Sequence, residues 1–181
     1  MHPKSPLINR PASDIVALGR DGPVSAATLS HRALHLARQL PAHRYVINLC
    51  ADPIEFMFGF CAAMAAGQCT LMPPNRLEST IAEVRDDYPD GYVMGSGGGD
   101  FDVRAALAET PTKPEGAFDP IEPDPDQLGT IAFTSGSTGK PQPNRKYWNT
   151  LRTGAIANAP MMLGPLDETV HQLTTVPPHH M

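Results

Sequence analysis

The chain has 181 residues, a net charge of −5 and 41% hydrophobic residues, which together are typical of one globular domain with a sizeable core. Its longest basic cluster is the pair Arg145 and Lys146, so we expect no nucleic-acid partner. No apolar run reaches the roughly 18 residues of a membrane-spanning helix and the N-terminus lacks a signal-peptide core, so we expect no membrane span and a cytoplasmic location.

The first part of the chain alternates short apolar runs with helical patterns. Residues 13–18 predict a short strand, and Thr28 is expected to be the N-cap of a helix that Pro41 ends. Residues 45–50 form a nearly continuous apolar run and predict a buried strand. The helix expected between Thr28 and Pro41 carries apolar residues at 4-3-4 spacing, the period of an amphipathic helix: Leu29, Ala33, Leu36 and Leu40.

A strongly apolar helix is predicted next. Asp52 is its expected N-cap, Pro53 occupies the first helical position, and Gly67 ends it. The body is apolar on almost every side, so we expect it to be buried. Residues 70–72 predict a short strand, and a second 4-3-4 stripe then predicts another helix: Leu77, Ile81, Val84 and Tyr88.

Residues 91–94 predict a strand that leads into the glycine-rich loop 95–100. A second phosphate site in that loop is the alternative to a flexible turn, and the turn is favoured because neither a lysine nor a strong helix pattern follows. Residues 101–108 predict a short helix. The three cysteines, Cys50, Cys61 and Cys69, lie in apolar segments and are expected to be small buried hydrophobic residues rather than disulfides, ligands or nucleophiles.

Residues 110–127 are rich in proline and acidic side chains, which predicts a solvated surface connection. A metal site is the alternative, disfavoured because the interleaved prolines keep the carboxylates extended and apart. Its candidate ligands are Asp119, Glu122, Asp124 and Asp126.

The most informative segment is the loop at residues 133–141, FTSGSTGKP, which follows a strand predicted at residues 128–133. Glycines let a backbone approach an anion closely, and successive amides can form an anion-binding nest. Hydroxyl groups and one lysine complete a loop that suits a polyphosphate. The candidate phosphate-binding residues are Thr134, Ser135, Gly136, Ser137, Thr138, Gly139 and Lys140.

The loop differs from a Walker P-loop, which needs G-x-x-x-x-G-K followed by Ser or Thr. Here Pro141 follows Lys140, and Thr134 stands where the first glycine would be. A helix is expected over residues 148–159 and a strand over 169–176. Strands alternating with helices predict an α/β fold with a mainly parallel sheet flanked by helices, and its ligand is expected at the carboxyl ends of the strands.

The segment T-S-G-S-T-G-K-P resembles the phosphate-loop signature of the AMP-forming synthetases, which include acyl-CoA synthetases, adenylation domains and luciferases. Two more blocks are similar to their N-terminal part: residues 24–40, and the strand-helix-strand-helix segment 48–90. By position in the terminal VPPHHM, His180 matches a histidine that these enzymes carry near the acyl pocket, beside His179. The resemblance implies that residues 1–181 are an N-terminal portion of their large domain.

The resemblance implies a two-step ligase reaction. A carboxylic acid attacks the α-phosphorus of ATP to give an acyl-adenylate and pyrophosphate, and the thiol of coenzyme A or an acyl-carrier protein then takes the acyl group. The implied cofactors are ATP, Mg²⁺ and that thiol, with most Mg²⁺ ligands downstream of this chain, and His180 is the implied catalytic residue. Fatty acid metabolism is the implied setting.

Two features separate the chain from the family pattern. Gln142 stands where the family often has Lys, and PNRKYW replaces a strand that usually contains Gly-Val-Val. Family members also continue for several hundred residues, so we expect the 181-residue chain alone to be inactive and to self-associate through uncovered apolar surface. A non-catalytic nucleotide- or partner-binding remnant, and an unrelated kinase-like phosphate binder, are the alternative readings.

Overall fold

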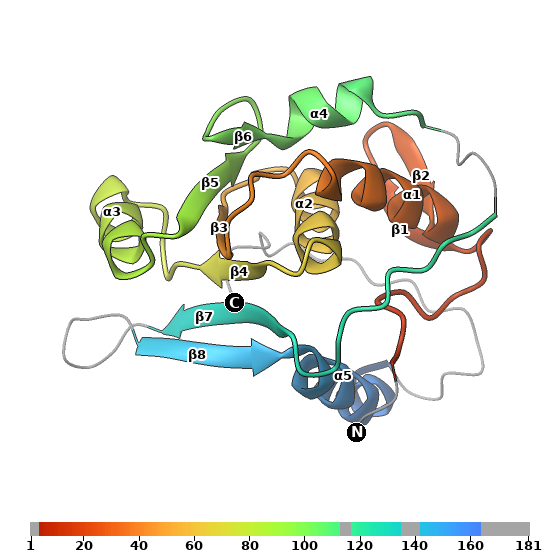
Figure 1. Cartoon of the computed structure of the whole chain (residues 1–181). Coiled ribbons are helices and arrows are strands. Elements are labelled where there is room, and N and C mark those ends of the chain that lie inside the picture. Colours follow the sequence, from red (N-terminus) through yellow and green to blue (C-terminus); the bar gives the residue numbers. More distant parts are fainter. Residues whose placement is uncertain (1–3, 113–116, 135–141, 164–181) are drawn as a thin grey trace.

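The computed structural model describes residues 4–112, 117–134 and 142–163, which form two sheets and five helices (Figure 1). A small antiparallel hairpin, β1 (Ile15–Gly19) with β2 (Gly22–Ser25), lies apart from a six-stranded sheet. The six-stranded sheet has the order β6-β5-β3-β4-β7-β8, and only β8 runs antiparallel to its neighbour. Its strands are β3 (Tyr45–Asn48), β4 (Cys69–Met72), β5 (Gly91–Gly95), β6 (Phe101–Asp102), β7 (Leu128–Thr134) and β8 (Gln142–Tyr147).

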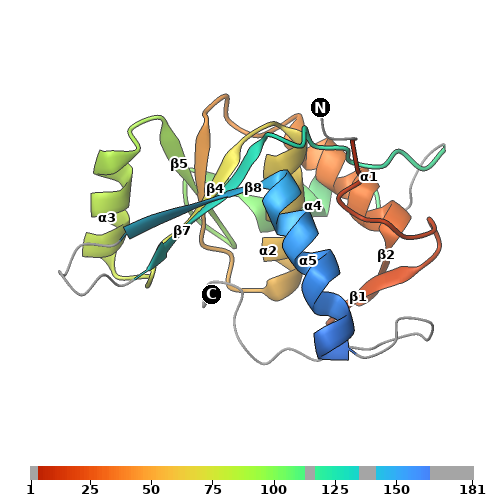
Figure 2. The same cartoon turned by 90° about the horizontal axis from the view of Figure 1, so that it is seen from below.

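The helices cover the sheet on both faces, which confirms the predicted α/β class with a mainly parallel sheet. Figure 2 shows α3 on one side of the sheet and the other four helices on the opposite side. The chain crosses from β3 to β4 in one direction and then back past β3 to β5, so right-handed crossovers put α2 and α3 on opposite faces. The helices are α1 (Ala26–Ala37), α2 (Pro53–Ala65), α3 (Glu78–Asp87), α4 (Val103–Glu109) and α5 (Trp148–Leu163).

The two faces carry two separate apolar clusters. The larger cluster packs α1, α2 and α4 against β3 and β5, and Phe58 and Leu36 are almost fully buried in it. The smaller one packs α3 against β3, β4 and β7, around Ile47, Leu71 and Ile131. The predicted burial of α2 is confirmed in its C-terminal half, where residues 61–64 are all buried.

The start of α2 agrees with the sequence in detail. The side chain of Asp52 accepts hydrogen bonds from Ile54 N at 2.8 Å and Glu55 N at 3.2 Å, and Pro53 follows at the first position. Gly67, just beyond the helix, has a φ of +73°, which few other residues adopt.

The predicted N-terminus of α1 was wrong by three residues. Ser25 is the N-cap, and its hydroxyl oxygen accepts a hydrogen bond from Thr28 N at 3.1 Å. Thr28 has the right chemistry for a cap, but the backbone is already helical at Ala26. The helix ends at Ala37, before the predicted Leu40.

The stripe predicted for α3 was partly wrong, because Leu77 is 64% exposed and precedes the helix as its N-cap. The helix predicted over residues 101–108 begins two residues later, since Phe101 and Asp102 pair with β5 as β6. Asp102 then caps α4 by accepting a hydrogen bond from Ala105 N at 3.2 Å.

Strands β2, β6 and β8 were not predicted, whereas the strands predicted at residues 13–18, 45–50, 70–72, 91–94 and 128–133 are present as β1, β3, β4, β5 and β7. Helix α5 runs to Leu163 and includes Pro160. The strand predicted at residues 169–176 lies outside the described residues.

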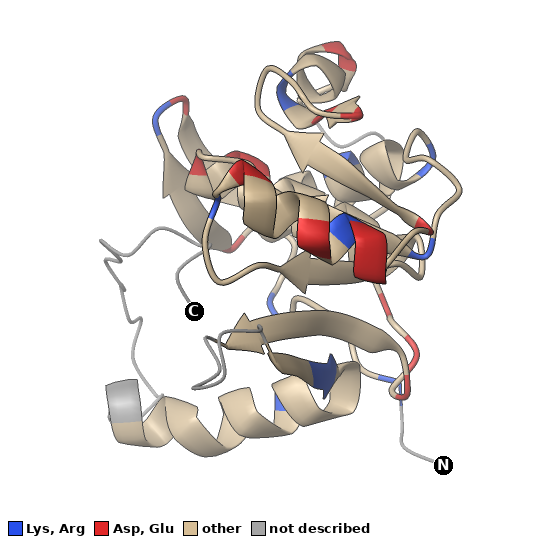
Figure 3. Cartoon of the chain, turned by 90° about the vertical axis from the view of Figure 1, so that its left-hand side faces the viewer, with Lys and Arg blue, Asp and Glu red and all other residues tan. Residues whose placement is uncertain are grey.

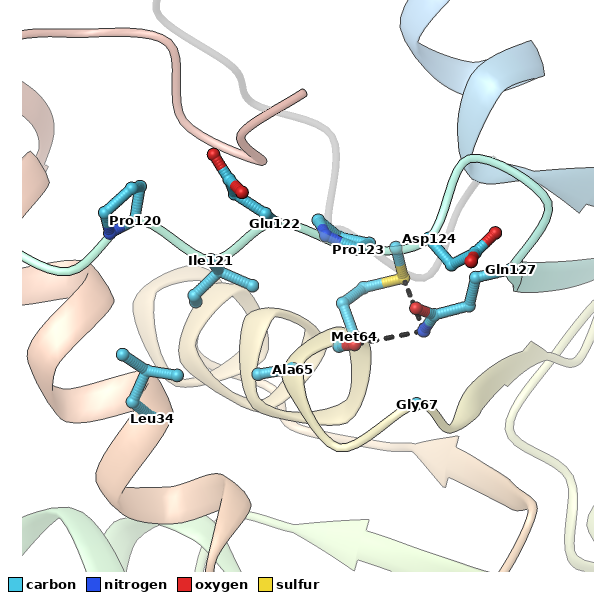
Figure 4. A pocket seen from close by; sticks show the side chains of 10 residues that line it. All are labelled: Leu34, Met64, Ala65, Gly67, Pro120, Ile121, Glu122, Pro123, Asp124 and Gln127. Carbon is cyan, nitrogen blue, oxygen red and sulfur yellow. Dashed lines mark hydrogen bonds between the residues drawn. The ribbon is translucent and has the colours of Figure 1, made fainter. Parts of the chain in front are cut away.

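The acidic, proline-rich connection packs more closely than predicted. Its described C-terminal part, residues 117–127, is here called the strap. Ile121 is only 4% exposed, and its carbonyl oxygen accepts a hydrogen bond from Leu7 N at 2.8 Å. Figure 4 shows Ile121 directed toward Leu34 and Ala65, with Glu122 directed away from them. The strap is therefore a covering layer, with buried apolar and exposed acidic residues alternating along it.

Charged groups lie mainly on the outer surfaces. Figure 3, with α3 toward the viewer, shows acidic residues gathered on the outside of that helix; they are Glu78, Glu83, Asp86 and Asp87. No helix in the described ranges is both long and apolar enough to cross a membrane.

Candidate functional site

The predicted phosphate loop emerges from the carboxyl end of β7. Thr134 is the last residue of that strand, is exposed, and is the one candidate phosphate-binding residue that the structure describes. Thr134 pairs with Gln142, the first residue of β8, so the two ends of the intervening segment are adjacent strand partners. Paired residues of an antiparallel ladder lie about 5 Å apart. Residues 135–141 therefore connect a closed stem, and the six other candidates lie outside the described residues: Ser135, Gly136, Ser137, Thr138, Gly139 and Lys140.

The edge at which the stem ends is the predicted ligand-binding edge of the sheet. Strands β3, β4, β5 and β7 are parallel, so all four carboxyl ends face the same way. The connections after β3 and β4 lead to α2 and α3 on opposite faces, which is the topology at which open α/β sheets bind their ligands.

Arg76 is a cation near the carboxyl ends of β3 and β4 that the sequence had not singled out. Its Nη2 donates to the backbone oxygen of Cys50 at 2.9 Å, which ties the connection after β4 to the one after β3. Its buried Nε has no hydrogen-bond partner among the described residues. Burial lowers the pKa of the Arg76 guanidinium, which still remains charged at neutral pH. Its place just beyond a strand end was the signal that could have identified it.

The glycine-rich loop after β5 has the properties of a turn. Gly97 and Gly99 have φ values of +86° and +90°, which favour glycine. The side chain of Asp102 accepts a hydrogen bond from Gly97 N at 3.0 Å, and Asp100 accepts one from Val93 N at 2.8 Å. Asp102 thus occupies a loop amide that an anion would need, and Asp100 ties the loop back to β5, which supports the turn over the second phosphate site.

The three cysteines are buried and free, as the sequence predicted. Burial raises the pKa of Cys50 to about 11 and those of Cys61 and Cys69 to about 12. A thiol with such a pKa is protonated at neutral pH and is a poor nucleophile.

A cavity of about 270 Å³ lies under the strap, at the amino edge of the sheet and thus opposite the phosphate loop. Gln127 closes one end by donating its Nε2 to Met64 O at 3.0 Å, and Figure 4 shows Glu122 directed away from the helices. The cavity is lined by Leu34, Met64, Ala65, Gly67, Pro120, Ile121, Glu122, Pro123, Asp124 and Gln127.

Two further predictions bear on catalysis. His180 and its neighbour His179 lie outside the described residues. Among the residues that are described, no three His, Cys, Asp or Glu side chains gather into a group that could hold a metal ion. Asp119, Glu122, Asp124 and Asp126 of the strap accordingly form no such cluster.

No protein-family model matches the chain. Among curated proteins, it is 23% identical over 161 residues to nonribosomal peptide synthetase 7 of Aspergillus fumigatus, a match that covers 84% of this chain and 7% of that protein.

Solved structures give a firmer comparison. The O-succinylbenzoate coenzyme A synthetase MenE of Bacillus subtilis, in complex with AMP, superposes with a TM-score of 0.64 at 18% identity, over 86% of this chain and 43% of MenE. The N-terminal subdomain of Klebsiella oxytoca NpsA, in complex with 3-hydroxybenzoyl-AMSN, gives 0.61 at 21% identity, over 84% and 41%. Apo MatB of Rhodopseudomonas palustris gives 0.55 at 17% identity, over 82% and 34%.

These similarities confirm the fold expected from the sequence resemblance. The chain has the fold of the N-terminal part of adenylate-forming enzymes, and it spans less than half the length of each of these solved relatives.

Proposed function

We propose that the chain is the N-terminal part of an ATP-dependent acid–thiol ligase. In that reaction a carboxylic acid is activated as an acyl-adenylate, and the acyl group then passes to the thiol of coenzyme A or a carrier protein. One observation carries the proposal: the sequence T-S-G-S-T-G-K-P begins at the carboxyl end of a parallel strand, in a fold otherwise seen in adenylate-forming enzymes.

The proposed role of the loop is electrostatic. Displacement of pyrophosphate from ATP spreads negative charge over phosphate oxygens, and fixed donors stabilise that charge. The loop offers amides, hydroxyl groups and the ammonium group of Lys140, beginning at Thr134 on the exposed end of β7. The hydroxyl groups belong to Thr134, Ser135, Ser137 and Thr138.

Mg²⁺ would share this charge when bound, as one of the relatives, MenE in complex with ATP and magnesium ion, illustrates. Because the described residues supply no cluster of metal ligands, we assign its ligands to parts of the protein other than those described. His180 is proposed to lie near the acyl group, and the cytoplasm is the proposed location.

A non-catalytic nucleotide-binding remnant is the second candidate. It is favoured by Gln142 in place of a second lysine and by the polar composition of β8, where the family carries a Gly-Val-Val strand. The two candidates share the phosphate loop and differ in whether adenylate forms.

The test replaces Lys140 by Ala and titrates inorganic pyrophosphate and ATP into the full chain by calorimetry. One loop without an adenine pocket should bind either ligand with a Kd of about 1 mM or weaker, with little preference for ATP over GTP. Lys140→Ala removes a charge-assisted contact of about 1.5–3 kcal/mol, so binding should weaken by about ten- to a hundredfold.

Lys4→Ala is the matched control, because it removes the same charge from the N-terminal segment far along the chain from the loop. Equal affinities for the two lysine variants and the parent chain would reject the phosphate loop. Carboxylate-dependent exchange of pyrophosphate into ATP, measured on the complete protein of which this chain is proposed to be the N-terminal part, then separates the candidates, since a ligase catalyses it and a remnant does not. Exchange by the 181-residue chain itself would contradict the expected lack of turnover.

A further inference from the structure

Phe133, the residue immediately before the first candidate phosphate-binding residue, Thr134, is held by an aromatic contact with a residue of α3's C-terminal end. Phe133 is 5% exposed, and its ring centroid lies 5.8 Å from that of Tyr88 at an interplanar angle of 86°. Such edge-to-face pairs are directional, because the ring edge is positive and the ring face negative. The contact therefore helps to bury the Phe133 ring and also restrains its orientation.

Tyr88 is itself fixed from several sides. It is the C-cap residue of α3, and its backbone N–H donates to Val84 O at 3.0 Å. Its ring makes a second edge-to-face contact with Tyr45 on β3, at 4.9 Å. The guanidinium of Arg44 lies 5.7 Å from the Tyr45 ring centroid and extends this stack. Tyr88 thus connects the C-terminal end of α3 and the start of β3 to the carboxyl end of β7.

The second strand of the stem carries a positive charge that influences Tyr88. Arg145 on β8 pairs in register with Ile131 on β7, and its charge acts on the Tyr88 hydroxyl. Burial raises the pKa of Tyr88, and the positive charge of Arg145 partly opposes that shift. Phe133, one residue before Thr134, contacts Tyr88 through its ring, whereas Arg145, three residues after Gln142, acts on Tyr88 through its charge.

We propose that Tyr88 is a positioning residue for the phosphate loop: from the end of α3 it braces β7, the strand from whose carboxyl end the loop projects. The expected consequence of removing Tyr88, weaker phosphate binding, rests on the proposed function. The restraint that Tyr88 places on the stem can be measured separately from phosphate binding. Tyr88 contacts the stem and is not assigned any contact with the phosphates.

The test compares Tyr88→Leu with the parent chain by two measurements. The first is the backbone order parameter of the Thr134 amide, which should fall from the rigid range of about 0.85 to about 0.6 or below. The second is the Kd for inorganic pyrophosphate, which should rise about three- to tenfold. Tyr88→Phe keeps both ring contacts and should restore both values.

Tyr92→Leu is the matched control, since Tyr92 is 2% exposed and packs in the cluster on the opposite face of the sheet. It should lower global stability while leaving the Thr134 amide ordered. Equal changes in the two leucine variants, or no change in Tyr88→Leu, would overturn the proposal.

Two results have separate meanings. If the parent chain fails to bind pyrophosphate, the proposed function fails, and the order parameter alone decides whether Tyr88 braces the stem. If Tyr88→Leu does not fold, Phe133→Leu removes the same ring contact from the other side and must produce the same loss of order at Thr134.

Discussion

Replacing Ile121 by Ala tests whether the strap belongs to the core. Ile121 is 4% exposed and packs against the larger apolar cluster, so the substitution removes three buried carbon atoms. At about 0.8 kcal/mol per buried carbon, the lost transfer free energy is about 2.5 kcal/mol. The adjoining cavity of about 270 Å³ lets the strap settle inward, which keeps the added cavity penalty small.

We therefore expect the free energy of unfolding to fall by about 2–3 kcal/mol, and Tm by about 5–10 °C for a chain of this length. Urea denaturation followed by circular dichroism measures the first, with an unchanged m-value. Glu122→Ala, at the neighbouring exposed position, should change stability by less than about 0.5 kcal/mol. A similarly small effect of Ile121→Ala would refute the covering role and return the strap to a solvated connection.

Three further predictions follow from exposure, thiol burial and capping. Five large apolar side chains are 54–86% exposed, namely Ile15, Leu18, Leu77, Ile156 and Met161, so the chain should bind a hydrophobic dye and self-associate. A monomer that binds no dye at any concentration would argue against this. The cysteine thiols should resist a disulfide reagent at pH 8 until the chain unfolds, and rapid labelling of the native protein would contradict their burial. Their pKa values are raised above the value of about 8.5 for an exposed thiol, so the unfolded chain loses these protons first, and the free energy of unfolding should decline as the pH rises above about 8.5. Asp52→Ala leaves two amides at the start of α2 without their acceptor and should cost about 1 kcal/mol in thermal or urea unfolding, whereas an unchanged midpoint would mean that solvent replaces the cap fully.

The sequence predicted best where one residue type has one physical use. Asp52 followed by Pro53 can begin a helix and do little else, and the apolar run that starts at Tyr45 had to become a buried strand. The parallel sheet followed from the alternation of such strands with helical stripes. The phosphate loop was predicted from its composition and from the strand before it; that strand is confirmed as β7, and the loop itself stays a prediction.

The sequence predicted poorly where tertiary contacts decide. Strand β8 has the polar composition of a loop, and it is a strand because β7 offers its edge for pairing. Ile121 stands among prolines and acids that suggest solvent exposure, and it is buried because the ends of α1 and α2 leave a hollow beneath it. Arg76 belongs to no motif, and its place beside Cys50 depends on which strand ends are adjacent.

The N-terminal segment is fastened to parts of the chain that are synthesised much later. The backbone oxygen of Ser5 accepts a hydrogen bond from the indole N–H of Trp148 at 3.3 Å, across 143 residues of sequence, and Leu7 is bonded to Ile121 in the strap. During translation the hydrogen bond of Leu7 can form only after the strap has left the ribosome, and that of Ser5 only after Trp148 has. Closing such long loops late makes folding slow, and it leaves the N-terminal segment available to chaperones throughout that time.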